Sequence, residues 1–89
     1  MSESLYTINE ARQDLRKALA TVLEEQVPPL DDEMNLFQEF RLDSMSMLET
    51  LMELEDMLGF NVDPEELDIK DFETVGGYST FLVNIKAAA

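Results

Sequence analysis

The segment from Ser44 to Leu58 constrains the fold most, because it is a predicted helix with two separate apolar stripes. A helix on the surface of a small domain needs only one such stripe to pack on the core. At 100° per residue, each stripe covers an arc of about 60°, and the two arcs lie roughly 100–120° apart. The first stripe contains Met47, Leu51, Leu54 and Leu58, and the second contains Met45, Leu48 and Met52.

We expect the first stripe to pack on a core and the second to stay exposed until a partner covers it. Glu49, Glu55 and Asp56 lie beside the second stripe, which favours contact with water. Methionine also suits a surface that fits several partners, because its side chain is flexible and polarizable. The alternative is that the helix is more deeply buried and that both stripes belong to the core.

The composition indicates one small domain over residues 1–89, and a hydrophobic content of 45% is enough for a packed interior. The chain has no His and no Cys, which excludes the commonest general base, a thiol nucleophile and ordinary zinc sites. It also has no stretch of 18 apolar residues and no signal-peptide pattern. We therefore expect a cytoplasmic monomer without a membrane span, a bound metal or an enzymatic activity.

The net charge of −14 argues against binding to the phosphate backbone of nucleic acids and favours basic protein surfaces as partners. From Leu42 through Ile69 the sequence contains no Lys or Arg and many Asp and Glu residues. A solvated face without a partner is the alternative explanation for such a run.

The pattern before residue 44 predicts one helix and one long loop. A helix is expected from Thr7 to about Gln26, because its apolar residues share one face and Thr7 and Glu10 have the spacing of a capping box. Val27-Pro28-Pro29 is expected to end it, since proline disfavours a continuing helix. Residues 30–43 are expected to form an ordered loop, held by Leu30, Met34, Leu36, Phe37, Phe40 and Leu42.

The pattern after residue 58 predicts a helix end and two further helical segments. Gly59 is placed to end the helix in the left-handed conformation, and Asp63-Pro64-Glu65-Glu66 favours a short helical turn. A last helix is expected near Val75, but Gly76-Gly77 predicts that it begins late or frays at its start. The sequence therefore predicts an all-α protein, a four-helix bundle of three main helices and a short third one.

Asp43-Ser44-Met45 resembles the modification site of acyl and peptidyl carrier proteins, in which the serine receives the 4′-phosphopantetheine arm of coenzyme A. That family is a four-helix bundle with a long first loop, as expected here. By resemblance, Asp43 flanks the attachment residue Ser44, and the face of Met45, Leu48, Glu49, Met52, Glu55 and Asp56 meets partner enzymes. The resemblance runs from about Leu30 to Leu82 and includes Leu36-Phe37, Asp43-Ser44-Met45, Leu48, Leu51, Leu54, Glu55, Gly59-Phe60, Val62 and Thr74-Val75.

The start of a helix suits a phosphodiester, because its first backbone amides are free and the helix dipole is positive there. No base in the chain can activate Ser44, which implies a separate phosphopantetheinyl transferase. The resemblance also implies an acyl- or aminoacyl-loading enzyme and downstream synthase or tailoring enzymes. The alternative for Ser44 is that it only caps the helix.

Two residues depart from the common pattern of the family. Arg41 stands where many carrier proteins have glycine, and Met45 stands where many have leucine or isoleucine. Asp-Ser-Met looks more like D-alanyl carrier proteins and discrete carriers of polyketide or nonribosomal peptide pathways. Arg41 would select a transferase or contact an acidic cargo, unless it is simply a solvated loop residue. The rival hypothesis from another class is an acidic helical adaptor or a nucleic-acid mimic without a prosthetic group.

Overall fold

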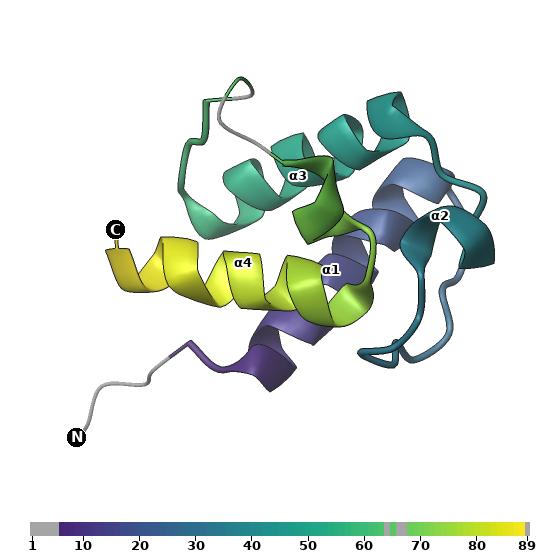
Figure 1. Cartoon of the computed structure of the whole chain (residues 1–89), viewed down its shortest axis with the longest axis horizontal. Helices are drawn as coiled ribbons and strands as arrows, with labels where there is room; N and C mark the ends of the chain where they lie inside the picture. Colours follow the sequence, from purple (N-terminus) through teal and green to yellow (C-terminus); the bar gives the residue numbers. More distant parts are fainter. Residues whose placement is uncertain (1–5, 64, 66–67, 89) are drawn as a thin grey trace.

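Helices account for most of the residues described in the computed structural model, which are 6–63, 65 and 68–88, and the expected all-α class is confirmed (Figure 1). In chain order the elements are α1 (Ile8–Leu23), α2 (Leu36–Glu39), α3 (Ser44–Leu58), the 3-10 helix η2 (Ile69–Phe72) and α4 (Val75–Ala88). The first turns of α3 and α4 and the whole of α2 lie at one end of the molecule, on the right in Figure 1.

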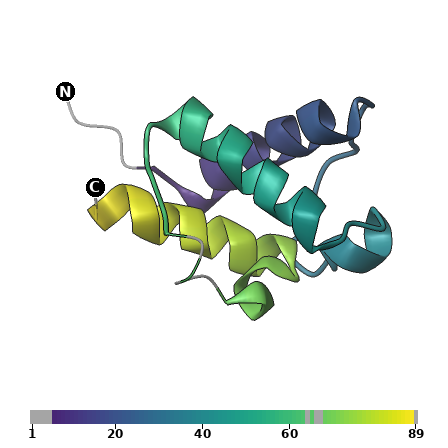
Figure 2. The ribbon, with the colours of Figure 1, turned by 90° about the horizontal axis from the view of Figure 1, so that it is seen from above.

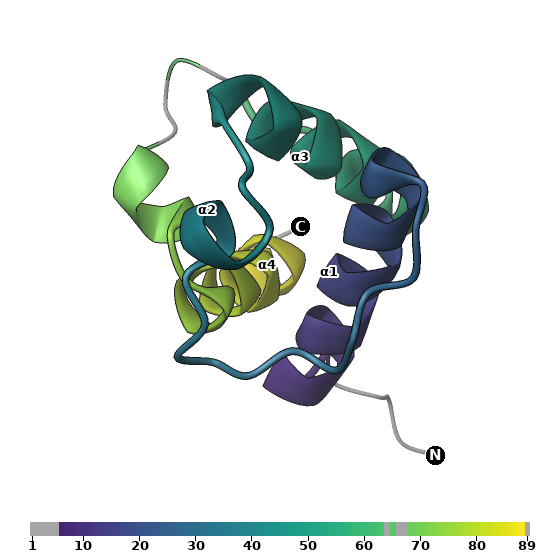
Figure 3. The same ribbon diagram turned by 90° about the vertical axis from the view of Figure 1, so that its right-hand side faces the viewer.

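The core lies between α1, α3 and α4. α1 packs against both of the other long helices, and Figures 2 and 3 show the three around a common centre. The stripe of α3 that was expected to face the core does so: Met47, Leu51 and Leu54 are buried, and Leu58 packs at its edge. The buried apolar residues of the other two long helices are Ala11, Leu15, Ala18, Leu19, Val75, Tyr78 and Leu82.

The capping box predicted for α1 is confirmed, but the expected end of this helix is wrong. The Thr7 side chain accepts from the Glu10 N–H, and the Glu10 side chain accepts from the Thr7 N–H. α1 ends at Leu23 rather than near Gln26, because Glu24 adopts the left-handed conformation with φ 57°. The chain thus turns before it reaches the prolines.

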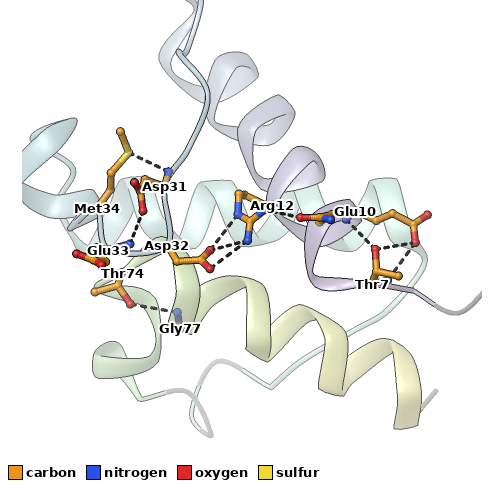
Figure 4. A network of polar contacts seen from close by, with 10 residues as sticks. Thr7, Glu10, Arg12, Asp31, Asp32, Glu33, Met34, Thr74 and Gly77 are labelled. Atoms are coloured by element: carbon orange, nitrogen blue, oxygen red, sulfur yellow. Dashed lines mark hydrogen bonds and ion pairs between the residues drawn. The ribbon is translucent and has the colours of Figure 1, made fainter.

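The loop after α1 is ordered, as expected, and it also contains the short helix α2, which the sequence analysis missed. The sequence feature that could have indicated α2 is Asn35, a favourable capping residue. Its side chain accepts the N–H of Gln38 at 3.1 Å. Arg12 fastens the loop to α1 with two hydrogen bonds to the Asp32 carboxylate, from Nε at 2.9 Å and from Nη2 at 3.1 Å (Figure 4). Leu36 and Leu42, which belong to this segment, are buried.

The expectation that α4 begins late is wrong, since α4 begins at Val75 and keeps both glycines in its first turn. Its first amides donate to the loop, from Val75 N–H to the Met34 carbonyl and from Gly76 N–H to the Asp32 carbonyl, each at 3.0 Å. The Thr74 side chain accepts the Gly77 N–H (Figure 4). These tertiary and capping bonds offset the low helix propensity of glycine.

Gly77→Ala is expected to lower the free energy of unfolding by about 1–3 kcal/mol, although alanine favours helices. A Cβ at Gly77 would lie 2.9 Å from the Asp71 carbonyl oxygen and 3.1 Å from Thr74 Oγ1, so the backbone or the cap must shift. Urea denaturation measures the change, and Thr80→Ala, at an exposed position of the same helix, is the control. A Gly77→Ala protein as stable as the control would contradict this account of the glycine.

The short third helix is seen only in part. Of the turn predicted at Asp63-Pro64-Glu65-Glu66, Pro64 and Glu66 lie outside the described residues. Asp63 Oδ1 accepts the Glu65 N–H at 2.9 Å, as a cap at Asp63 requires. η2 begins later, at Ile69, where Asp68 accepts the Lys70 N–H.

Candidate functional site

The start of α3 is capped by Asp43. Asp43 has extended backbone angles, its Oδ1 accepts the Ser46 N–H at 2.9 Å, and its carbonyl accepts the Met47 N–H at 3.0 Å. Ser44 is the first helical residue. The alternative that Ser44 serves as the cap is therefore wrong, because the neighbouring aspartate has that role.

The hydrogen bonds at this cap hold the pKa of Asp43 below its ordinary value of 3.8. The largest cause is the backbone N–H of Ser46, followed by the Ser46 hydroxyl. A carboxylate whose pKa is lower in the folded state stabilises the fold above its unfolded pKa, and this contribution is lost as the pH falls through the folded pKa. The negative charge at the positive end of the helix dipole acts in the same direction.

Asp43→Asn tests the charge of the cap, because asparagine keeps an oxygen that can accept the Ser46 N–H. The wild-type chain is expected to be more stable than the variant at neutral pH, and this difference is expected to shrink as the pH falls below 3.8. Urea denaturation of both proteins from neutral pH to about pH 2 measures the difference. A difference that stayed constant with pH would show that the Asp43 charge does not stabilise the helix.

The start of α3 has the features of an anion-binding position. The amides of Ser44, Met45 and Ser46 precede the first backbone bond within the helix, which the Met47 N–H makes. α3 has 15 residues, so its dipole places partial positive charge at this end. Asp43 takes the Ser46 N–H, and an anion joined to Ser44 would stand beside the earlier amides.

The second apolar stripe of α3 is exposed, as expected. The exposed fractions of Met45, Leu48 and Met52 are 66%, 41% and 65%, compared with 3% for Met47 and 0% for Leu54. The alternative that both stripes lie in the core is therefore wrong. The exposed stripe begins one residue after Ser44 and continues for two turns of α3.

Met52 stands between two surface hollows. One hollow, of about 420 Å³, is lined by Glu49, Met52 and Glu53 of α3 together with Thr21 and Val22 of α1. The other, of about 540 Å³, is lined by Met52, Glu55, Asp56, Gly59, Phe60 and Asn61. The sequence analysis missed the contribution of α1, because it expected the apolar residues of that helix to share one face, whereas Val22 is only half-buried.

The acidic side chains beside the exposed stripe differ in what they contact. Glu49 and Asp56 are exposed. Glu55 is half-buried, and its Oε2 accepts the Val62 N–H at 2.8 Å. Glu55 therefore ties the segment that follows α3 to the helix, a contact that the helix pattern alone did not indicate.

Arg41 has a positive φ of 53°, and its side chain is exposed. In this left-handed region glycine is unstrained and other residues are uncommon. The departure from the family pattern noted above therefore falls at a backbone position where glycine fits best. Among the residues that the structure describes, only Arg12 and Asp32 form an ion pair. Arg41 therefore has no carboxylate partner among them.

Residues 6–63, 65 and 68–88 hold no group of three or more carboxylates arranged to bind a metal ion. None of their helices combines the length and the hydropathy that crossing a bilayer requires.

A family model described as "Phosphopantetheine attachment site" matches residues 13–82 of the chain. The matched segment begins in α1 and ends in α4, so it contains the whole of α3 and the loop that precedes it. None of the curated proteins compared with the chain matches it.

Proposed function

We propose that Ser44 carries the prosthetic group of this chain, which belongs to the phosphopantetheine attachment-site family, since the family model matches residues 13–82. Members of this family carry a covalently attached 4′-phosphopantetheine and are carriers rather than catalysts. The function proposed for the chain is to hold an acyl or aminoacyl group on this arm and to deliver it to partner enzymes.

The observation that carries the choice of Ser44 is its place beside Asp43 as the first residue of α3. The matched segment contains only two other serines, Ser46 and Ser79. Ser79 is completely buried in α4. Ser46 is half-buried, and its N–H donates to the Asp43 carboxylate. Ser44 is therefore the serine at the first helical position, where the early amides favour an added phosphate.

The residues around Ser44 fit the prosthetic group. The early amides of α3 and the helix dipole favour the phosphodiester, and the Asp43 cap keeps the first turn of the helix in place. When bound, the group supplies a terminal thiol that holds the cargo as a thioester, which suits a chain without cysteine.

The attachment step needs an enzyme. The Ser44 oxygen would form the new bond to the phosphorus that carries the pantetheine arm, its proton would pass to a base, and the nucleotide part of coenzyme A would leave. The chain has no His or Cys to serve as that base. A phosphopantetheinyl transferase is therefore the first partner that the proposal requires.

The exposed stripe of Met45, Leu48 and Met52 is proposed as the surface that meets the transferase, the loading enzyme and the enzymes that use the cargo. Flexible methionines fit partners of different shape, and the hollows on both sides of Met52 offer room for apolar side chains. The flanking carboxylates, Glu49, Glu55 and Asp56, would attract basic residues in salt-sensitive contacts.

For the pathway, we place the chain among discrete carriers of polyketide or nonribosomal peptide biosynthesis. The support is the Asp43-Ser44-Met45 sequence, which also has some likeness to D-alanyl carrier proteins. Mass spectrometry of the chain purified from its producing cells with the thioester intact would identify the cargo.

Intact mass after incubation with coenzyme A and a transferase of broad specificity tests the attachment itself. The wild-type chain is expected to gain one phosphopantetheine group. Trypsin then cleaves after Arg41 and Lys70, so the group should be found on the peptide of residues 42–70, which excludes Ser79. No gain with an active transferase, or a gain on another peptide, would overturn the proposal, and no gain would favour the acidic adaptor.

A further inference from the structure

Arg41 is an isolated cation in the most acidic part of the chain. It is the only Lys or Arg between Lys17 and Lys70, and every other charged residue in that interval is Asp or Glu. It nevertheless has no ion pair with a carboxylate of the described residues. The two nearest acids along the chain are Glu39 and Asp43. Glu39 forms no ion pair with Arg41, and Asp43 directs its carboxylate to the Ser46 N–H.

The backbone at Arg41 does not favour an arginine. With φ 53°, the residue lies in the left-handed region, where a side chain is strained and glycine is not. The other non-glycine residue with positive φ in the described part, Glu24, ends α1. Arg41 follows Phe40, the C-cap of the four-residue helix α2, and its side chain is exposed. The end of α2 accounts for the turn of the backbone there, but not for an arginine in place of glycine.

The prosthetic group would add an anion three residues from Arg41. Three residues span at most about 11 Å of extended chain, and arginine binds phosphate oxygens with several donors at once. The phosphodiester would also meet the repulsion of Asp43, the residue that precedes Ser44 in the chain. An added negative charge at this place therefore calls for a counter-ion, and Arg41 is the one cation that the interval contains.

We propose that Arg41 is the counter-ion of the phosphodiester on Ser44, an inference that rests on the attachment proposed above. Arg41 would thereby offset the destabilisation that the prosthetic group brings to an acidic chain. It would also restrict the first part of the arm near the start of α3.

Melting temperatures of the apo and holo forms test this role, in the wild type and in three variants. Arg41→Gln removes the charge and keeps a side chain at the strained position, whereas Arg41→Lys keeps the charge. Lys17→Gln is the matched control, because it removes the same charge from another exposed residue. Lys17 lies on α1 and lines a hollow between that helix and the loop that follows it.

In low salt, attachment of the group is expected to lower the melting temperature of Arg41→Gln by about 2–4 °C more than that of the wild type. Lys17→Gln should respond to attachment as the wild type does, and Arg41→Lys should recover at least half of the difference. In roughly 1 M salt, where the screening length is about 3 Å, the difference should disappear. The phosphorus-31 resonance of the holo protein should shift between the wild type and Arg41→Gln, and not between the wild type and Lys17→Gln.

An equal response of Arg41→Gln and the wild type to attachment, with no change in the phosphorus resonance, would overturn the role of Arg41. Intact mass is measured before melting, so a wild-type chain that gains no group overturns the Ser44 attachment and is not mistaken for a failure of Arg41.

Discussion

Ser44→Ala is expected to abolish the gain of phosphopantetheine completely, whereas Ser46→Ala is expected to keep it. The first substitution removes the oxygen that would bond to phosphorus. The second removes a hydroxyl only two residues away on the same helix and leaves Ser44 in place. Intact mass after incubation with coenzyme A and transferase measures both variants beside the wild type.

Loss of folding would not explain a negative result for Ser44→Ala. Asp43 caps α3 through its own carboxylate and carbonyl, and the core stripe of the helix begins only at Met47. The variant should therefore keep the helical circular dichroism spectrum of the wild type and melt within a few degrees of it. If Ser44→Ala still gained the group, or if Ser46→Ala lost it, the attachment residue would have been assigned wrongly.

Leu54→Ala is expected to lower the free energy of unfolding by about 2–5 kcal/mol, the range for truncating a fully buried leucine. Leu54 is 0% exposed in the core between the three long helices. Because domains of this kind have a total stability of about 5–15 kcal/mol, the variant would lose a large part of it. Urea denaturation measures the change, with the wild type and the variant fitted to the same dependence of the unfolding free energy on urea concentration.

Met52→Ala is the matched control for the two-stripe arrangement, since Met52 lies two residues from Leu54 on the same helix and is 65% exposed. Its effect on stability is expected to stay within about 0.5 kcal/mol. If the exposed stripe is a docking surface, the transferase should attach phosphopantetheine to this variant more slowly than to the wild type. Similar losses of stability in Met52→Ala and Leu54→Ala would contradict the division of α3 into a buried and a free stripe.

Several features could be predicted from the sequence because their causes lie within a few residues. The capping box of Thr7 and Glu10, the left-handed Gly59 after α3 and the separation of the two stripes follow from side chains that are neighbours on one helix. The candidate site is also a local feature of the sequence, since Asp43 and Ser44 are adjacent in the chain.

Other features depended on segments that meet only in the folded chain. α4 begins at Val75 because the carbonyls of Asp32 and Met34 receive its first amides, and no local propensity reports such partners. The end of α1 at Leu23 and the bond from Val62 N–H to Glu55 likewise required the three-dimensional path of the chain.

The sequence by itself determined the helical class, the two faces of α3 and the serine at its start, because helix periodicity and capping act over one or two turns. Only the tertiary structure decided what lies beside the exposed stripe of α3 and how the chain enters that helix. It brought Thr21 and Val22 of α1 beside Met52, and it showed that Arg41 occupies a backbone position that favours glycine. Packing between distant segments sets both features, and their energies are spread over contacts that no short stretch of sequence contains.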